Sequence, residues 1–317
     1  MRAATLTAHR RLVWAGLLAF VVATGSAWIP LDPASATYPG SDGLILYSAN
    51  TSELWTMGSD GSDRRLLTDN GEDGVWSPDG QRIAFRGYTD EPGTPFLNWD
   101  IWVMNADGSG RVRITRRYSY EGDVTWSPNG EWLAFSSNRR GRSEVYKKRS
   151  TGSGRTIRLT RRTGVRGDVR PEWSPLGDVI AFTRRRPSVW SIRTVPRSGG
   201  DTTLVARDLH APSWSPDGSR ILSDTTTYRT MVHMAVDGSD VVEVGDRSGV
   251  WLGAISPVWS PQGDRILFTH YEYDEFGEPS SAIYLTAADG GGEPVALVQG
   301  VGRNALVRDP DWQPLSP

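Results

Sequence analysis

Charged side chains recur at a fixed distance before a tryptophan. Asp73, Asp123 and Asp309 each stand three positions before a Trp, and other polar residues hold that position or the one before it. The full set is Glu72, Asp73, Asp123, Arg170, His210, Ser256, Arg308 and Asp309. If folding brings these groups together, they could hold a ligand, a metal ion or an inserted segment of a partner. Structural ion pairs and ordered water, which commonly line narrow channels, are the simpler interpretation.

The sequence contains no local catalytic motif. It has no G-x-S-x-G elbow, no H-E-x-x-H pair and no cysteine, and its histidines beyond residue 36 are His210, His233 and His270. These three are 23 and 37 residues apart, which excludes a local zinc pattern. We therefore predict no catalytic residue, no metal ligand and no cofactor. Carboxylates such as Asp73, Asp123 and Asp309 could still meet as an acid and a base if the fold assembles them.

Two segments, 87–99 and 270–281, combine aromatic with acidic residues. Their aromatic members include Tyr88, Phe96, Trp99, Tyr271, Tyr273 and Phe276. Such segments suit a basic protein partner, or a polar ligand with apolar or sugar-ring faces. The alternative is an ordinary solvated loop whose aromatic rings fold back onto neighbouring strands.

The elements that must position these residues are internal repeats. Trp76-Ser77-Pro78-Asp79-Gly80 recurs, with variation at the fourth position, at Trp126, Trp173, Trp214 and Trp259, and a truncated copy stands at Trp312. The intervals between these tryptophans are 50, 47, 41, 45 and 53 residues, the period of a four-stranded propeller blade. In each copy a strand ends in Trp, the Ser-Pro-x-Gly stretch turns, and a β-rich strand such as Ile83-Ala84-Phe85 follows. One Trp per blade at a fixed position predicts a core role for these rings.

The two ends of the repeat region complete each other. Residues 44–47, 54–57 and 66–68 read as three strands without a preceding Trp strand, whereas Trp312 ends a strand without a blade after it. The sequence therefore predicts an all-β, six-bladed β-propeller of four-stranded antiparallel blades over residues 37–317. Pairing of the C-terminal strand with the N-terminal strands would close it and remove exposed edges.

The repeats resemble those of the TolB-type, WD-like β-propeller family over roughly residues 42–314. The resemblance rests on the W-S-P-D-G turn followed by I-A-F, and on the I-W-V-M-N-A-D-G-S-G hairpin that ends in I-T. It implies a protein-binding propeller, because TolB propellers receive a lipoprotein partner at the channel opening. If a signal peptide is cleaved, we expect the stretch between it and Leu44 to be too short for the separate N-terminal domain of periplasmic TolB. Similar repeats also form propellers of prolyl-oligopeptidase-like hydrolases and of some polysaccharide lyases.

The N-terminus has the pattern of an export signal. Arg2, Arg10 and Arg11 precede an apolar stretch, and Ala34-Ser35-Ala36 has the form of a signal-peptidase site. We expect residues 1–36 to be a signal peptide cleaved after Ala36, which places the protein outside the cell or in the periplasm or cell envelope. Residues 12–29 kept as a membrane anchor, and export through a twin-arginine signal, are the alternatives.

Charge and motifs together favour a binding protein. A net charge of −2 argues against a generic nucleic-acid binder, whose phosphate contacts need a basic surface. We predict a monomeric protein- or peptide-binding module that uses the channel residues and the long-loop face, with membrane contact only if the N-terminal segment is retained. The alternative is a carbohydrate-binding protein or a small lyase or hydrolase with its site at the channel mouth.

Overall fold

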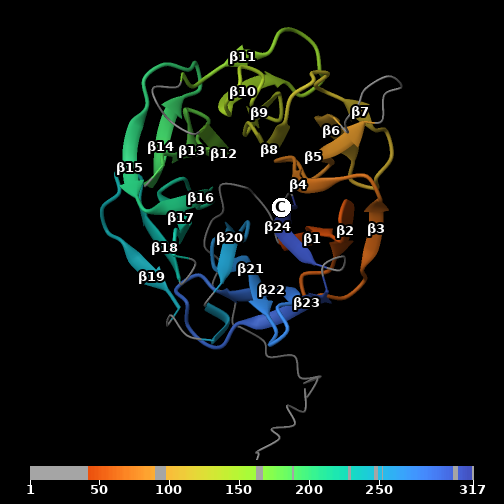
Figure 1. The fold of residues 1–317 in the computed structure, drawn as a ribbon, viewed down its shortest axis with the longest axis vertical. Helices are drawn as coiled ribbons and strands as arrows, with labels where there is room; N and C mark the ends of the chain where they lie inside the picture. The colour runs from red at the N-terminus through yellow and green to blue at the C-terminus, as the bar shows by residue number, and fades with distance from the viewer. Residues whose placement is uncertain are drawn as a thin grey trace, which may run out of the picture. The chain divides into compact units, whose positions relative to one another are not determined.

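The computed structural model describes residues 42–89, 98–161, 167–187, 189–227, 230–245, 249–251, 253–302 and 306–315. Their strands form six four-stranded antiparallel sheets arranged as blades around a central channel (Figure 1). This confirms the predicted fold class. The predicted signal peptide, residues 1–36, and Phe96 lie outside the described residues. Within the described part of the chain, no helix has the length and apolar character needed to cross a membrane.

Each blade runs from an inner strand beside the channel to an outer strand at the rim. The first complete blade contains β4 (Glu72–Trp76), β5 (Arg82–Thr89), β6 (Asn98–Asn105) and β7 (Val112–Arg113). The next contains β8 (Glu121–Trp126), β9 (Trp132–Ser137), β10 (Glu144–Arg149) and β11 (Ile157–Arg158). The third contains β12 (Gly167–Trp173), β13 (Val179–Arg185), β14 (Trp190–Pro196) and β15 (Thr203–Arg207).

The remaining blades follow the same order. The fourth contains β16 (Leu209–Trp214), β17 (Arg220–Thr225), β18 (Met231–Ala235) and β19 (Val242–Val244). A short 3-10 helix, η1 (Gly249–Trp251), precedes the fifth, which contains β20 (Ala254–Trp259), β21 (Arg265–Tyr273), β22 (Pro279–Ala287) and β23 (Val295–Val301). The last blade joins β24 (Val307–Pro314) to β1 (Asp42–Ala49), β2 (Glu53–Met57) and β3 (Arg65–Thr68).

The ring closes through this composite blade. Strand β24 pairs antiparallel with β1, with Trp312 opposite Ile45 and Asp311 opposite Leu46. The two ends of the described chain therefore supply one sheet. Closure therefore gives β1 an inner partner and completes the sixth four-stranded sheet, as the sequence predicted.

The Ser-Pro-x-Gly turns have a defined chemical basis. Ser77 Oγ donates to an oxygen of the Asp79 carboxylate at 2.5 Å and accepts the backbone N–H of Arg82 at 2.9 Å. Gly80 takes the positive φ of 65° that ends the turn. The turn thus fixes the register between inner strand β4 and strand β5.

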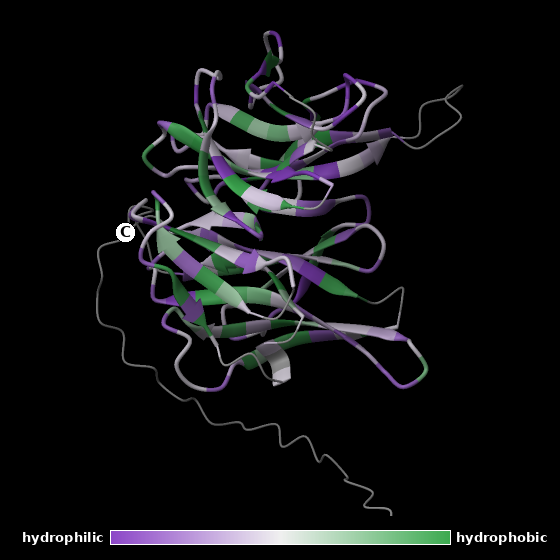
Figure 2. Cartoon of the chain, turned by 60° about the vertical axis from the view of Figure 1, so that its left-hand side comes forward, coloured by the Kyte–Doolittle hydropathy of each residue, from purple (hydrophilic) through white to green (hydrophobic). Residues whose placement is uncertain are grey.

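The core lies between neighbouring blades. Trp126 of β8, for example, packs in one buried cluster with Ala84, Ile101 and Val103 of the preceding blade. Hydrophobic stretches lie along the strands and hydrophilic ones in many of the connecting loops (Figure 2). The Trp of every inner strand except β20 is between 3% and 7% exposed, in accordance with the predicted core role.

Candidate functional site

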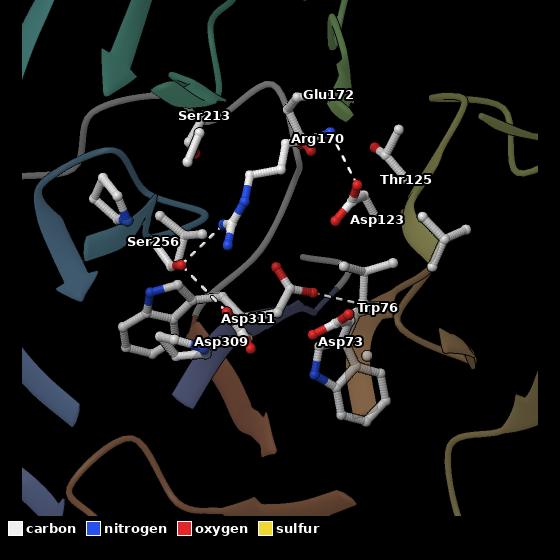
Figure 3. A pocket seen from close by; sticks show the side chains of 18 of the residues that line it. Asp73, Trp76, Asp123, Thr125, Arg170, Glu172, Ser213, Ser256, Asp309 and Asp311 are labelled. Carbon is white, nitrogen blue, oxygen red and sulfur yellow. Dashed lines mark hydrogen bonds between the residues drawn. The ribbon is translucent and has the colours of Figure 1, made fainter. Parts of the chain in front are cut away.

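A polar cavity of about 460 Å³ occupies the channel. Residues of all six inner strands line it, from Asp73, Asp123 and Asp309 at the strand beginnings to prolines of the Ser-Pro turns at the far end. Figure 3 shows charged side chains from several blades pointing into this space. Five of the six tryptophans that end the inner strands also line the cavity, all but Trp173.

A backbone irregularity aims the side chains at the mouth. Each inner strand carries a β-bulge, and the residue three before its Trp adopts a left-handed φ between 50° and 53°. Around the channel these residues are Asp73, Asp123, Arg170, Ala211, Ser256 and Asp309, which we call the mouth ring. A left-handed conformation costs a non-glycine residue about 1 to 2 kcal/mol, so the surrounding structure must hold it.

Side chains of the neighbouring blade help to hold these bulges. The N–H of Asp73 donates to Ser48 Oγ at 3.0 Å, that of Ala211 to Thr183 Oγ1 at 3.0 Å, and that of Asp309 to Thr269 Oγ1 at 3.2 Å. Each acceptor directly follows the aromatic residue of its blade's second strand. The position three before Trp is therefore built into the repeat as a channel-facing position.

Hydrogen bonds connect the mouth ring across the channel. Arg170 donates through its guanidinium to Ser256 Oγ at 3.0 Å and through its backbone N–H to the Asp123 carboxylate at 3.2 Å. Ser256 Oγ in turn donates to Asp309 Oδ1 at 3.2 Å (Figure 3). Strands β8, β12, β20 and β24 are thus joined through one cation.

Arg86, which sequence reasoning missed, links the ring to the aromatic residues of the long-loop face. Its guanidinium lies 2.8 Å from Glu72 and 3.1 Å from Asp73, and donates to the Tyr120 hydroxyl at 2.6 Å. It also lies 4.8 Å from the ring centre of Trp99. Tyr88 then packs edge-on against Trp99, at 5.9 Å between ring centroids. The predicted Tyr88 and Trp99 are therefore connected to the channel, although only through Arg86.

Arg308 makes a second polar cluster at the mouth. It forms ion pairs with Glu72 and, at 3.4 Å, with Asp309, and donates to the backbone carbonyl of Asn50 at 3.0 Å. Tyr271 lines the same cavity. Burial raises the pKa of Tyr271 to about 12, so its hydroxyl stays protonated at neutral pH.

The structure places three other predicted residues away from the cavity. His210 stands four residues before Trp214, and Ala211 takes the ring position of that strand. The His210 side chain is buried, with Nδ1 2.6 Å from Asp224 and its ring 4.9 Å from that of Trp190. Tyr273 and Phe276, at the end of the β21–β22 hairpin, are 72% and 83% exposed and do not line the cavity.

Several channel carboxyl groups titrate near neutral pH. Burial raises the pKa of Asp73 to about 7, with Arg86 opposing the rise and Asp309 and Asp123 adding to it. Deeper in the cavity, burial raises the pKa of Glu172 to about 8, and Asp311 adds to that rise. Burial also raises the pKa of Asp311 to about 7, although its carboxylate accepts the N–H of Trp76 at 2.7 Å.

Glu172 and Asp311 were not among the site residues predicted from the sequence. The feature that could have identified them is their position directly before the Trp of an inner strand. Within the described residues, no group of three or more Asp, Glu or His side chains has a geometry that could hold a metal ion. The cavity therefore offers hydrogen-bonding and charged groups for a polar ligand, together with three carboxyl groups able to exchange protons near pH 7.

Six four-stranded blades around a central channel make this protein a six-bladed β-propeller. The chain belongs to the TolB beta propeller domain family, whose model matches residues 73–251, more than half of the chain.

Individual relatives agree with this assignment. An uncharacterized protein of Agrobacterium fabrum is 27% identical over 204 residues, which cover 59% of this chain and 66% of that protein. The Tol-Pal system protein TolB of Anaeromyxobacter dehalogenans is 40% identical over 82 residues, 25% of this chain and 18% of that protein. The match thus spans slightly under two thirds of the first relative and under a fifth of the second.

Solved structures give the same fold. The crystal structure of TolB from Acinetobacter baumannii has a TM-score of 0.67 and 19% identity, over 86% of this chain and 67% of that one. At this identity the likeness establishes the arrangement of blades, and the function must be argued from the channel itself.

Proposed function

We propose that this TolB-like propeller is exported and binds a protein or peptide, as a monomer and without catalysis of its own, at the mouth of its channel. The observation that carries the proposal is the mouth ring, in which Arg170, Ser256 and Asp309 are aimed into one cavity by left-handed backbone. A cavity of about 460 Å³ lies within the size range of ligand sites. Membership of a family that includes Tol-Pal system proteins supports a protein partner in the cell envelope.

The chemistry of the cavity suits an inserted peptide segment. Charged groups of both signs at the mouth can pair with a polar chain and its backbone, while the Trp and Pro side chains further in offer apolar contact. The exposed Tyr273 and Phe276, on the same face as the mouth, extend the surface that a folded partner could contact.

Site-specific crosslinking tests this proposal in the producing cell. A photoreactive amino acid at Asp123, in the mouth, should yield a protein adduct that mass spectrometry identifies. The same amino acid at the exposed Asp201, outside the cavity lining, should not yield that adduct. The proposal fails if Asp123 gives no adduct, or if both positions give the same one. N-terminal sequencing of the exported protein tests cleavage after Ala36.

One observation favours the second candidate, a small lyase or hydrolase. Glu172 and Asp311 both line the cavity, and burial raises the pKa of each; Asp311 adds to the rise at Glu172. Their pKa values of about 8 and about 7 suit proton transfer at neutral pH. Turnover of an oligosaccharide by the purified protein, lost in Glu172→Gln, would establish this candidate. Absence of turnover across a panel of acidic and neutral oligosaccharides would leave binding as the function.

A further inference from the structure

The positive charge of the chain is concentrated in one region. Residues 111–161 contain 13 Arg and Lys but 4 Asp and Glu, whereas the whole chain has 35 and 37. The rest of the chain therefore carries 22 basic against 33 acidic residues. A local excess of nine positive charges in an otherwise acidic protein is a strong electrostatic feature.

The fold gathers part of this region around a second cavity, of about 610 Å³, at the edge between the β4–β7 and β8–β11 blades. The segment after β7, the β9–β10 loop, strand β10, the β10–β11 hairpin and β11 all contribute cations to its lining, and no carboxylate among the described residues lines it. The cations are Arg116, Arg117, Arg139, Arg140, Lys148, Arg155 and Arg158. We call this cavity the basic pocket.

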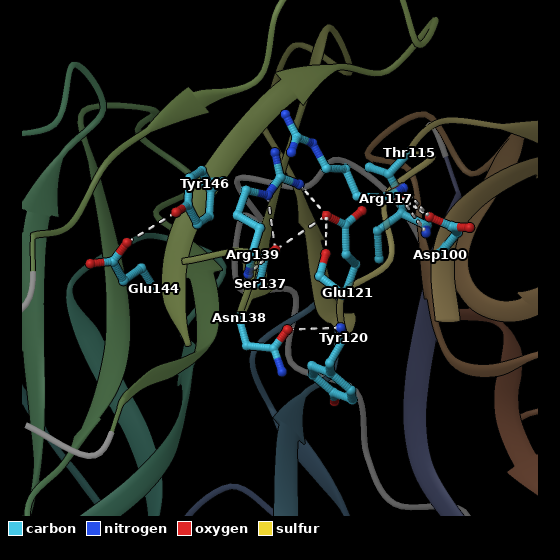
Figure 4. A network of polar contacts seen from close by, with 12 residues as sticks. Asp100, Thr115, Arg117, Tyr120, Glu121, Ser137, Asn138, Arg139, Glu144 and Tyr146 are labelled. Carbon is cyan, nitrogen blue, oxygen red and sulfur yellow. Dashed lines mark hydrogen bonds and ion pairs between the residues drawn. The ribbon is translucent and has the colours of Figure 1, made fainter. Parts of the chain in front are cut away.

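Two of its arginines are neutralised by buried carboxylates. Arg139 forms an ion pair with Glu121, and Arg158 lies 2.6 Å from Glu144. Figure 4 shows Arg139 reaching Glu121, with the side chain of Arg117 beside it. Both carboxylates are almost fully buried, so these two pairs belong to the framework of the blade.

The other arginines of the pocket have no such partner. Arg116, Arg117, Arg140 and Arg155 are exposed, and none of their guanidinium groups forms an ion pair or a hydrogen bond with another described residue. The backbone N–H of Arg117 donates to the Asp100 carboxylate at 3.4 Å. Lys148 donates to the carbonyl of Gly154 at 2.7 Å. Burial lowers the pKa of Lys148, and the nearby Arg139 and Arg116 lower it further, which shows like charges held in proximity.

We propose that the basic pocket binds a ligand that carries several phosphate groups close together. Seven cations line the pocket, and buried carboxylates neutralise two of them, so five positive charges surround a cavity of about 610 Å³. A phosphate monoester carries about −1.5 to −2 charges and three acceptor oxygens at pH 7, so two or three such groups balance the pocket within that volume. Guanidinium groups match phosphate oxygens in a bidentate geometry. Carboxylates, with one charge each, would need about five separate units in the same space.

Calorimetric titration of the purified protein tests the proposal, with inorganic tripolyphosphate as the soluble probe. Vesicles of phosphatidylcholine containing phosphatidic acid test a lipid source of the same phosphate chemistry, and polygalacturonate tests a carboxylate polymer. The test variant carries Arg116→Gln, Arg117→Gln, Arg140→Gln and Arg155→Gln. A matched control removes equal charge from exposed arginines outside the pocket, through Arg65→Gln, Arg186→Gln, Arg197→Gln and Arg207→Gln.

We expect the wild-type protein to bind tripolyphosphate or the acidic vesicles. The Kd of the test variant should be about 100-fold higher than that of wild type, and the Kd of the control should stay within about twofold of it. Binding by wild type should weaken as salt rises, because the contacts are ionic. The proposal is overturned if neither phosphate probe binds, if both variants lose binding equally, or if polygalacturonate alone binds. Circular dichroism checks folding of the test variant. If it does not fold, the single variant Arg155→Gln and the salt series on wild type decide.

Discussion

Arg170 and Ser256, on the inner strands of two blades that are not neighbours, are joined across the channel by a hydrogen bond of 3.0 Å. The intervening blade presents Ala211 at the equivalent position, which leaves room for the long arginine side chain to cross. Burial lowers the pKa of the same guanidinium, but the nearby carboxylates, among them Asp309, Asp123 and Asp73, raise it by more. Arg170 is therefore the cation of the mouth ring that offsets the repulsion among the three carboxylates, beside Arg86 at Asp73 and Arg308 at Asp309.

Replacement of that cation should destabilise the protein in a pH-dependent way. In Arg170→Gln the three ring carboxylates repel one another with less compensation, so we expect a loss of about 1 kcal/mol at pH 8, limited by solvent screening in the channel. The loss should shrink at pH 5, where Asp73, whose pKa burial raises to about 7, is protonated and no longer adds to the repulsion. Urea unfolding at the two pH values measures this. An equal loss at both would contradict the electrostatic role.

Glu172 and Asp311 should make the folded state less stable as pH rises. Their pKa values in the folded state, about 8 and about 7, lie above those of the unfolded chain. Between about pH 4 and 8 the folded protein therefore binds more protons, so the free energy of unfolding falls with rising pH. In Glu172→Gln with Asp311→Asn, that fall should flatten by at least roughly 1 to 2 kcal/mol, because each unit of pKa shift corresponds to about 1.4 kcal/mol. Unfolding curves from pH 4.5 to 8.5 test this, and an unchanged slope would show that the two groups titrate normally.

The composite blade should depend on its last strand. Deletion of residues 309–317 removes Trp312, which is 4% exposed, and leaves β1 without its inner partner β24. We expect the melting temperature to fall by roughly 10 degrees or more, because removal of a buried Trp alone costs about 3 to 5 kcal/mol. Deletion of residues 315–317 is the control and should leave it nearly unchanged. A similar melting temperature for both truncations would disprove closure by β24.

Much of the fold and part of the site can be predicted from sequence because the repeat encodes both. The Trp-Ser-Pro-x-Gly turns fix strand order, and the position three before Trp marks the mouth ring, as Asp123 and Ser256 illustrate. His210, the fourth residue before Trp214, lies outside the cavity because its side chain is buried against Asp224 and Trp190, whereas Arg308, also the fourth before its Trp, lines the cavity.

Residues that act through contacts between blades are harder to predict. Arg86 replaces the Ser or Thr that follows the aromatic residue in most second strands, and only the structure shows that it contacts Asp73 and Trp99. The basic pocket was missed for a similar reason. Arg117 and Arg155 are far apart in sequence. Both line the same cavity because the blades that contain β7 and β11 are neighbours in the folded ring.

The exposed hairpin end should separate binding from stability. Tyr273→Ser with Phe276→Ser removes two aromatic side chains that are 72% and 83% exposed, so the melting temperature should stay within about two degrees. If the partner contacts this hairpin, the adduct formed from Asp123 should weaken. The turn variant Asp79→Ser, which loses the hydrogen bond to Ser77, should instead lower stability modestly and leave the adduct intact. The reverse outcome would place the partner on the turn face.

Thiol protection at the channel mouth tests the central claim most directly. The chain has no cysteine, so Ser256→Cys introduces a single thiol in the mouth, and Ser198→Cys introduces one at an exposed site outside the cavity lining. The partner identified by crosslinking is added in excess, and the rate of alkylation by iodoacetamide is measured with and without it. With the partner bound, we expect alkylation at residue 256 to be at least roughly tenfold slower and the rate at residue 198 to be unchanged. Equal rates at residue 256 with and without the partner would contradict binding at the mouth.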